Sequence, residues 1–131
     1  MSAADLELAK HLATQAIGTV GTNLFAGELP AGVINGMVLT LYPGAPPELT
    51  CGSNGINLEI GRLQFQVRNT AEATAITKAQ DAAEIFAKIA GSTIEGTRYR
   101  SVTVLQTPGL LHRDESNRPV YGMNVEFERE V

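Results

Sequence analysis

Apolar and polar residues alternate along the C-terminal part of the chain. The apolar ones share one side of an extended backbone: Tyr121, Met123, Val125 and Phe127. Glycine, asparagine and glutamate occupy the positions between them. Because successive side chains of a strand point to opposite faces, this period of two predicts a half-buried β-strand after Pro119. A polar turn, residues 112–118, precedes it.

Three other long strands are predicted. Residues 33–42 are apolar at nearly every position, which is typical of a strand buried on both faces. Residues 58–68 alternate again, and a further strand covers about residues 101–106 after an irregular or bulged lead-in at 94–100. Residues 43–57 are rich in proline and glycine turn signals, so this segment is expected to be a functional or mobile arm.

Two segments have apolar residues at helical spacing, about residues 3–17 and about residues 71–90. The predicted order is therefore α-β-β-α-β-β in a single domain, residues 1–131, with the arm at 43–57 protruding from it. The expected fold class is α+β, a two-layer sandwich with both helices on one face of a mostly antiparallel four- to five-stranded sheet. The other sheet face is polar and charged, so it would be solvated or meet another subunit.

Composition and charge exclude several classes of protein. The formal net charge is −4 and there are only three lysines, with no basic cluster, so tight nucleic-acid binding is disfavoured. No apolar run approaches the ~20 residues of a membrane helix, and the acidic N-terminus does not resemble a secretory signal. The single cysteine, Cys51, excludes an intrachain disulfide and a clustered-thiolate zinc site.

Residues with catalytic potential are few. His11 falls within the first helix and is expected on its flank, while Cys51 has no basic residue close by in the sequence. His112 lies beside Asp114 and Glu115, and such a trio could bind a metal or act in acid–base chemistry. Consecutive residues of a turn rarely converge on one point, so a solvated turn is the favoured interpretation. We expect no catalytic, cofactor-binding or metal-binding residues, and no enzymatic activity.

A row of glutamates lies on the polar face of the last predicted strand: Glu126, Glu128 and Glu130. Like charges spaced two apart on one face repel, so something should offset them. One interpretation is a solvated or salt-bridged face, paired with Arg62 and Arg68. The other is a channel wall or an intersubunit contact, and the sequence leaves both open.

Several segments together carry a family resemblance. They are Asn23-Leu24-Phe25 with Gly27, Leu29 and Pro30; Tyr42-Pro43-Gly44 with Pro46; Leu58-Glu59; Arg62 to Arg68; and Pro108 with Asp114-Glu115 and Arg118-Pro119. In this order and spacing, over nearly the full length, the chain resembles the tail terminator (minor capsid or tail completion) proteins of long-tailed bacteriophages.

The resemblance implies the same helix-on-sheet sandwich and a structural function without a cofactor. Such proteins assemble as a homohexameric ring at the neck end of the virion tail. The ring caps the tail tube, stops its polymerisation and joins it to the head-side connector. The implied partners are thus the chain itself, the tube protein and the connector, with DNA only passing through the lumen and no membrane. The chain would be made in the host cytoplasm.

The resemblance also implies surfaces for these contacts. The arm would contact the tube or a neighbour through Pro43, Pro46, Pro47, Glu48 and Asn54. The turn at 110–118 would lie at a ring edge and contribute Asp114, Glu115 and Arg118. Arg62, Arg68 and the glutamate row would serve subunit contacts or the lumen.

Other functions stay open at this point. The chain could be another ring-forming head–tail connector, neck or tail tube protein, and tube proteins, unlike terminators, stack on themselves. A small cytoplasmic ligand-binding or regulatory domain would need a discrete pocket with convergent polar groups, and the sequence shows none. An enzyme would have to use His112, Asp114 and Glu115.

Overall fold

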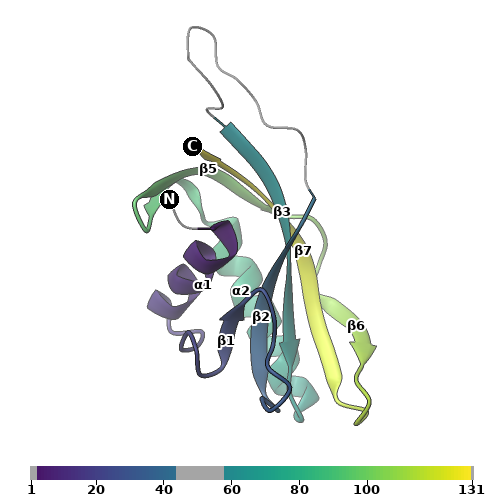
Figure 1. Cartoon of the computed structure of the whole chain (residues 1–131). Coiled ribbons are helices and arrows are strands. Elements are labelled where there is room, and N and C mark those ends of the chain that lie inside the picture. Colours follow the sequence, from purple (N-terminus) through teal and green to yellow (C-terminus); the bar gives the residue numbers. More distant parts are fainter. Residues whose placement is uncertain (1–2, 44–57, 131) are drawn as a thin grey trace, which may run out of the picture.

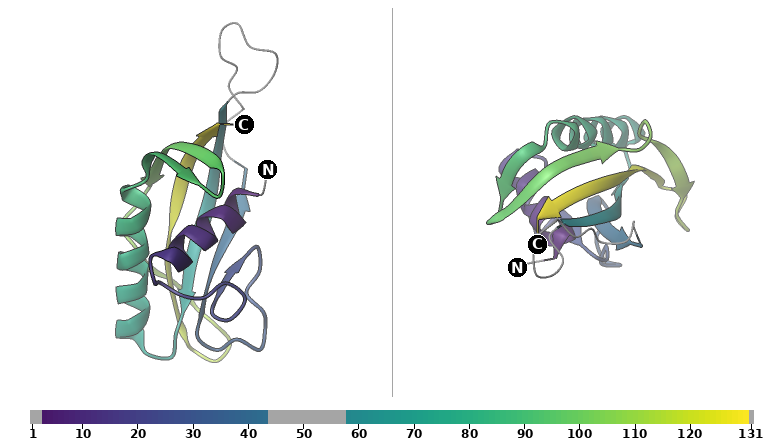
Figure 2. Two further views of the ribbon diagram at one scale, coloured as in Figure 1. Left: turned by 90° about the vertical axis from the view of Figure 1, so that its left-hand side faces the viewer. Right: turned by 90° about the horizontal axis from the view of Figure 1, so that it is seen from above.

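The computed structural model describes residues 3–43 and 58–130, which form two helices and one curled sheet (Figure 1). In chain order the elements are α1 (Ala4–Thr14), β1 (Leu24–Ala26), β2 (Gly36–Tyr42), β3 (Leu58–Arg68), α2 (Glu72–Ala87), β4 (Ala90–Ile94), β5 (Thr97–Val104), β6 (Gly109–Arg113) and β7 (Pro119–Glu130). Figure 2 shows α1 and α2 lying against the same face of the sheet.

The sheet has seven strands in the order β1-β2-β3-β7-β5-β4, and β6 pairs with β7 beside β5. β1 and β2 are parallel, whereas the other pairs are antiparallel. The expected α+β sandwich with a four- to five-stranded sheet is therefore wrong: the sheet is larger, mixed and curled into a half-barrel. Residues predicted to be loop, lead-in or polar turn supply the additional strands.

The predicted irregular lead-in at 94–100 is a tight hairpin. Ile94 pairs with Thr97, so only Glu95 and Gly96 form the turn between β4 and β5. Both have positive φ, 50° and 80°, which matches the twist of a two-residue hairpin. The predicted bulge lies within the same range, between Tyr99 and Ser101, where β5 shifts register against β7.

The long strands follow the sequence pattern closely. β3 spans Leu58–Arg68 as predicted, and β7 begins at Pro119. β2 begins at Gly36, later than the predicted residue 33, and it is buried only over its first half, since Leu41 is 40% exposed. β7 is central: it pairs with β3 along one edge and with both β5 and β6 along the other.

The core lies between the helices and the inward face of the sheet. β3 and β7 contribute alternate residues to it: Leu63, Phe65, Val67, Met123, Val125 and Phe127. α2 faces them with small side chains, Ala75, Ala79 and Ala82, which let the helix approach closely. Phe86 of α2 meets Phe65 edge-on, with 6.0 Å between the ring centroids.

Two glycines permit close approaches at the centre of the sheet. A Cβ on Gly61 would lie 2.3 Å from Cζ of Phe127, so the ring of Phe127 covers the backbone there. A Cβ on Gly122 would lie 2.0 Å from the carbonyl oxygen of Phe65 on β3. Any larger residue at either position has to displace its neighbour.

Candidate functional site

A buried charge cluster joins α1 to the sheet. Glu7 is 1% exposed, and both of its carboxylate oxygens accept hydrogen bonds. No buried side-chain nitrogen or oxygen of the described residues is left without a partner. Thr97 Oγ1 donates to Glu7 Oε2 at 2.7 Å, and Tyr99 OH and Arg129 Nη1 donate to Oε1 at 2.8 and 2.9 Å. Burial, followed by the hydrogen bond to Glu7, raises the pKa of Tyr99, so its hydroxyl remains a neutral donor.

The same cluster reaches β3. Arg129 Nε donates to Oε2 of Glu59 at 2.9 Å, so one guanidinium bridges a helix and a neighbouring strand. The sequence interpretation missed this cluster. Its signal is that Arg129 falls on the inward side of β7, two residues after Phe127, where an apolar residue is expected. The cluster holds α1 in place, because its donors and acceptors are used within it.

Asp114 organises the turn between β6 and β7. Its Oδ1 accepts hydrogen bonds from the backbone N–H groups of Ser116 and Arg118, at 3.0 and 2.8 Å, and its Oδ2 accepts from Arg118 Nε at 2.7 Å. Desolvation opposes ionisation of this carboxyl, but the hydrogen bonds outweigh it and hold its pKa below the usual range. The predicted polar turn is thus shorter than expected, since His112 belongs to β6.

Arg68 meets Asp114 from β3. Its Nε lies 3.8 Å from Asp114 Oδ2, and its guanidinium also donates to the backbone carbonyls of Val33 and Ile34. Next to this contact is a hollow of about 530 Å³ lined by Ala31, Arg68, His112, Arg113, Asp114, Glu115, Ser116 and Arg118. We call it the hairpin hollow. It brings together Arg68, Asp114 and Arg118, which the sequence had placed on two separate surfaces.

The uncovered face of the sheet carries the glutamate row. Glu126 pairs with Arg62 at 3.2 Å and Glu130 with Arg98 at 3.1 Å. The side chain of Glu128 makes no ion pair or hydrogen bond to the described residues. The row is therefore salt-bridged in part, by Arg98 in place of the Arg68 that the sequence suggested.

The centre of this face is polar without being charged. A shallow hollow of about 340 Å³ is lined by Thr40, Tyr42, Gln64 and Asn124, from three adjacent strands. Thr40 Oγ1 donates to the carbonyl oxygen of Gly27 and Gln64 Oε1 accepts from Gln66 Nε2, so the remaining amide and hydroxyl groups can bind water or a protein surface. No helix of the described residues covers this face (Figure 2).

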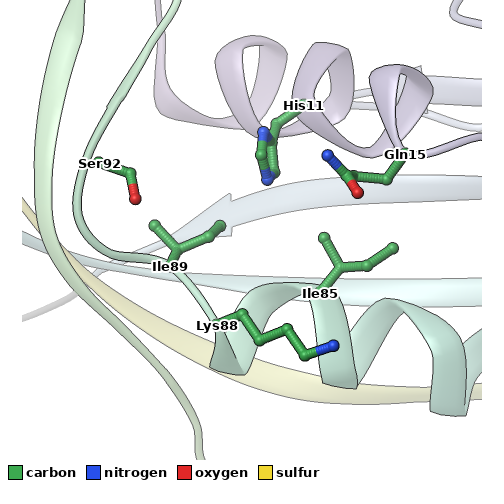
Figure 3. Close-up of a pocket in the computed structure, with 6 residues that line it drawn as sticks. All are labelled: His11, Gln15, Ile85, Lys88, Ile89 and Ser92. Atoms are coloured by element: carbon green, nitrogen blue, oxygen red, sulfur yellow. The ribbon is translucent and has the colours of Figure 1, made fainter.

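A third hollow, of about 240 Å³, lies between α1 and the C-terminal end of α2 (Figure 3). It is lined by His11, Gln15, Ile85, Lys88, Ile89 and Ser92, and His11 points toward the isoleucines. Burial lowers the pKa of His11 and favours the neutral imidazole. No carboxylate lines this hollow, so His11 has no acidic partner there for acid–base chemistry.

Among residues 3–43 and 58–130, no group of three His, Cys, Asp or Glu side chains could hold a metal ion. His112, Asp114 and Glu115 therefore do not form the metal site weighed from the sequence. Neither described helix is long and apolar enough to cross a membrane. Pro43 is exposed, whereas Pro46, Pro47, Glu48, Cys51 and Asn54 lie outside the described residues.

Comparison with known proteins connects this architecture to phage tails. Residues 11–131 match the model of a family described as bacteriophage tail terminator protein. No curated protein sequence matches the chain. A solved structure described as the virion of a native gene transfer agent (GTA) particle contains a similar chain, with a TM-score of 0.58 and 16% sequence identity. The alignment covers 99% of this chain and 100% of that one, and at this identity the similarity shows the fold alone.

The family match covers both helices in whole or in part and every strand of the sheet. The resemblance drawn from the sequence is thereby confirmed. The chain belongs to the bacteriophage tail terminator family, whose members are structural proteins of the phage tail.

Proposed function

We propose that this protein forms a homohexameric ring on the end of the phage tail tube, stops tube polymerisation and joins the tail to the head-side connector. The observation that carries the proposal is the family match over residues 11–131. On this proposal the protein is found at the neck end of the tail in the virion. Its partners are further copies of itself, the tube protein and the connector protein.

The shape of the subunit supports a ring. A closed ring needs two different surfaces on each copy, because the head of one subunit contacts the tail of the next. The described residues offer such surfaces: the uncovered polar sheet face and the hairpin hollow lie on different parts of the molecule. The arm at 43–57, with Pro43, Pro46, Pro47, Glu48 and Asn54, is proposed to contact the tube or a neighbouring subunit.

The charge distribution supports passage of DNA without retention. Nucleic-acid affinity comes largely from cations that neutralise phosphates, whereas this chain has a net charge of −4. On the uncovered sheet face, Arg62 is already paired with Glu126, and Glu128 adds a free negative charge. We assign Arg62 and the row Glu126, Glu128 and Glu130 to the lumen or to subunit contacts beside it.

The test is a tube-capping assay. Tube protein is polymerised with and without this protein, and tube lengths are measured by negative-stain electron microscopy. Shortened tubes, each with a ring at one end, are expected. Long tubes with this protein incorporated along them would instead identify a tube protein, and the absence of binding to tube ends would exclude the terminator function.

Deletion of residues 45–56 tests the arm separately. The deletion variant is expected to fold, with an unchanged circular dichroism spectrum, and to lose tube capping. Unchanged capping by the folded variant would remove the arm from the tube contact while leaving the proposed function intact.

A further inference from the structure

The hairpin hollow contains guanidinium donors that no described residue uses. It is lined by three arginines and two carboxylates, Asp114 and Glu115, and Asp114 is shared between two of the arginines. Arg118 uses only its Nε on Asp114, and its two terminal nitrogens make no hydrogen bond to the described residues. Arg113 is the most exposed of the three, at 41% of its side chain, and it pairs with Glu72 at 3.7 Å and donates to the carbonyl oxygen of Asn117. The hollow therefore leaves the terminal nitrogens of Arg118 open to an anionic group from outside, beside the half-exposed Arg113.

A single protein carboxylate fits the open donors of Arg118 best. Guanidinium groups present a planar fork of donors that matches a carboxylate. A nucleic-acid backbone fits poorly, because it needs a stripe of cations along its phosphates. Here the arginines are confined to one hollow. The hollow also contains Asp114 and Glu115, whose negative charges would repel the phosphates of a nucleic acid.

Glu95, in the tight turn between β4 and β5, is such a carboxylate. We call this turn, Glu95 and Gly96, the knob. Glu95 is exposed and forms no ion pair among the described residues. The two-residue turn between β4 and β5 fixes its backbone, with the paired residues Ile94 and Thr97 on either side. In Figure 1 this turn lies at the upper left and the turn between β6 and β7 at the lower right, on opposite sides of the subunit.

We propose that Glu95 of one copy inserts into the hairpin hollow of the next copy around the ring. This contact rests on the proposed ring and adds one pair of complementary groups to its head-to-tail interface. Since knob and hollow lie on opposite sides of the subunit, each copy donates one carboxylate and receives another. The pattern continues until the ring closes.

The first test removes the knob's charge while keeping its shape. Glu95→Gln is expected to weaken ring association by about tenfold or more, as for other desolvated charge pairs. Native mass spectrometry and sedimentation across protein concentration give the ring-to-monomer ratio. The matched control is Asp81→Asn, which neutralises an exposed carboxylate of α2 that also has no ion pair among the described residues. The control is expected to form rings like the unmodified protein.

The second test reverses charges on separate copies. Glu95→Arg carries a reversed knob and an unchanged hollow, whereas Arg113→Glu carries the opposite combination. Each variant alone is expected to stay monomeric, and an equimolar mixture is expected to assemble into rings in which the two alternate. Mass spectrometry distinguishes alternating rings by mass once one variant is isotope-labelled.

The outcomes separate this contact from the proposed function. Rings of Glu95→Gln as stable as those of the unmodified protein, or a mixture that fails to assemble from folded variants, overturn the contact and leave tube capping untouched. If Arg113→Glu does not fold, the comparison of Glu95→Gln with Asp81→Asn decides alone. An unmodified protein that forms no ring, even with tube ends present, overturns both proposals.

Discussion

Glu7 and Arg129 are separated by 122 positions in the sequence, yet Nη1 of Arg129 donates a 2.9 Å hydrogen bond to Oε1 of Glu7. Both side chains are almost fully buried, at 1% and 7% exposed. The pair fastens the first helix to the last strand at the end of the sheet where β5 and β3 also meet β7. The pair sets the position of α1 on the sheet. Apolar contacts tolerate a shift of the helix, whereas the buried carboxylate of Glu7 must stay within hydrogen-bond distance of Arg129.

Replacing Glu7 by Gln should therefore destabilise the fold. The change leaves Arg129 short of one buried partner, and breaking such a pair costs about 3 kcal/mol or more. Chemical denaturation at fixed protein concentration measures the loss as a shift of the unfolding midpoint. Glu28→Gln, at an exposed position in the loop after β1, is the control and should change stability by less than about 0.5 kcal/mol. Equal midpoints for the two variants would contradict the assigned role of the cluster.

The contact between Gly61 and Phe127 should also be intolerant of change. An added Cβ would lie 2.3 Å from Cζ of Phe127, so Gly61→Ala must push the ring out of the core at a cost of about 1–3 kcal/mol. Gly32→Ala is the matched control, because a Cβ there meets nothing within 4 Å. Combining Gly61→Ala with Phe127→Leu should recover part of the loss, measured as melting temperature, and an additive loss would argue against a steric cause.

Asp114 should make the β6–β7 hairpin sensitive to acid. Its pKa is lower in the folded protein than the ordinary 3.8, so its contribution is complete above the ordinary value and is lost as the pH falls through the lowered one. Melting temperature measured between pH 6 and pH 2.5 should thus fall less steeply for Asp114→Asn than for the unmodified protein. Parallel curves would show that Asp114 does not carry this dependence.

His11 should titrate below its ordinary value of 6.5, because burial between α1 and α2 disfavours the charged imidazole. A depressed histidine pKa means that stability rises with pH and that this contribution is lost as the pH falls through the folded-state pKa. Proton NMR of the His11 ring gives the midpoint directly. His11→Gln should flatten the stability profile near pH 6, and a midpoint at or above 6.5 would contradict the burial of the ring.

Sequence reasoning succeeded where a period was long enough to count. Polar and apolar residues alternate over residues 62–68 of β3 and 121–128 of β7, so the faces of these strands could be assigned, and both helices show an apolar stripe. β1, β4 and β6 have only three to five residues, too few to show a period, and their pairing depends on distant strands. The fold class was wrong for this reason, because these short strands are the ones that enlarge and curl the sheet.

The candidate site divides in the same way. Asp114 and Arg118 are four residues apart, so their contact within a turn was within reach of the sequence. The approach of Arg68 from another strand was not, and neither was the pairing of Glu130 with Arg98. Glu7 and Arg129 are each recognisable in the sequence as a charged residue at a core position of its element. The sequence does not indicate that these two residues pair with each other.

The central place of β7 has a consequence for synthesis of the protein. β7 follows every other described strand in the chain, and it alone joins β1-β2-β3 to β5-β4. During translation the two halves of the sheet can form locally, but their strands cannot be joined by pairing until residues 119–130 have left the ribosome. In a nascent chain interrupted before that point, no strand pairs the two halves, and β3 and β5 are left with open edges. Only subunits translated through β7 can present a complete surface to an assembling tail.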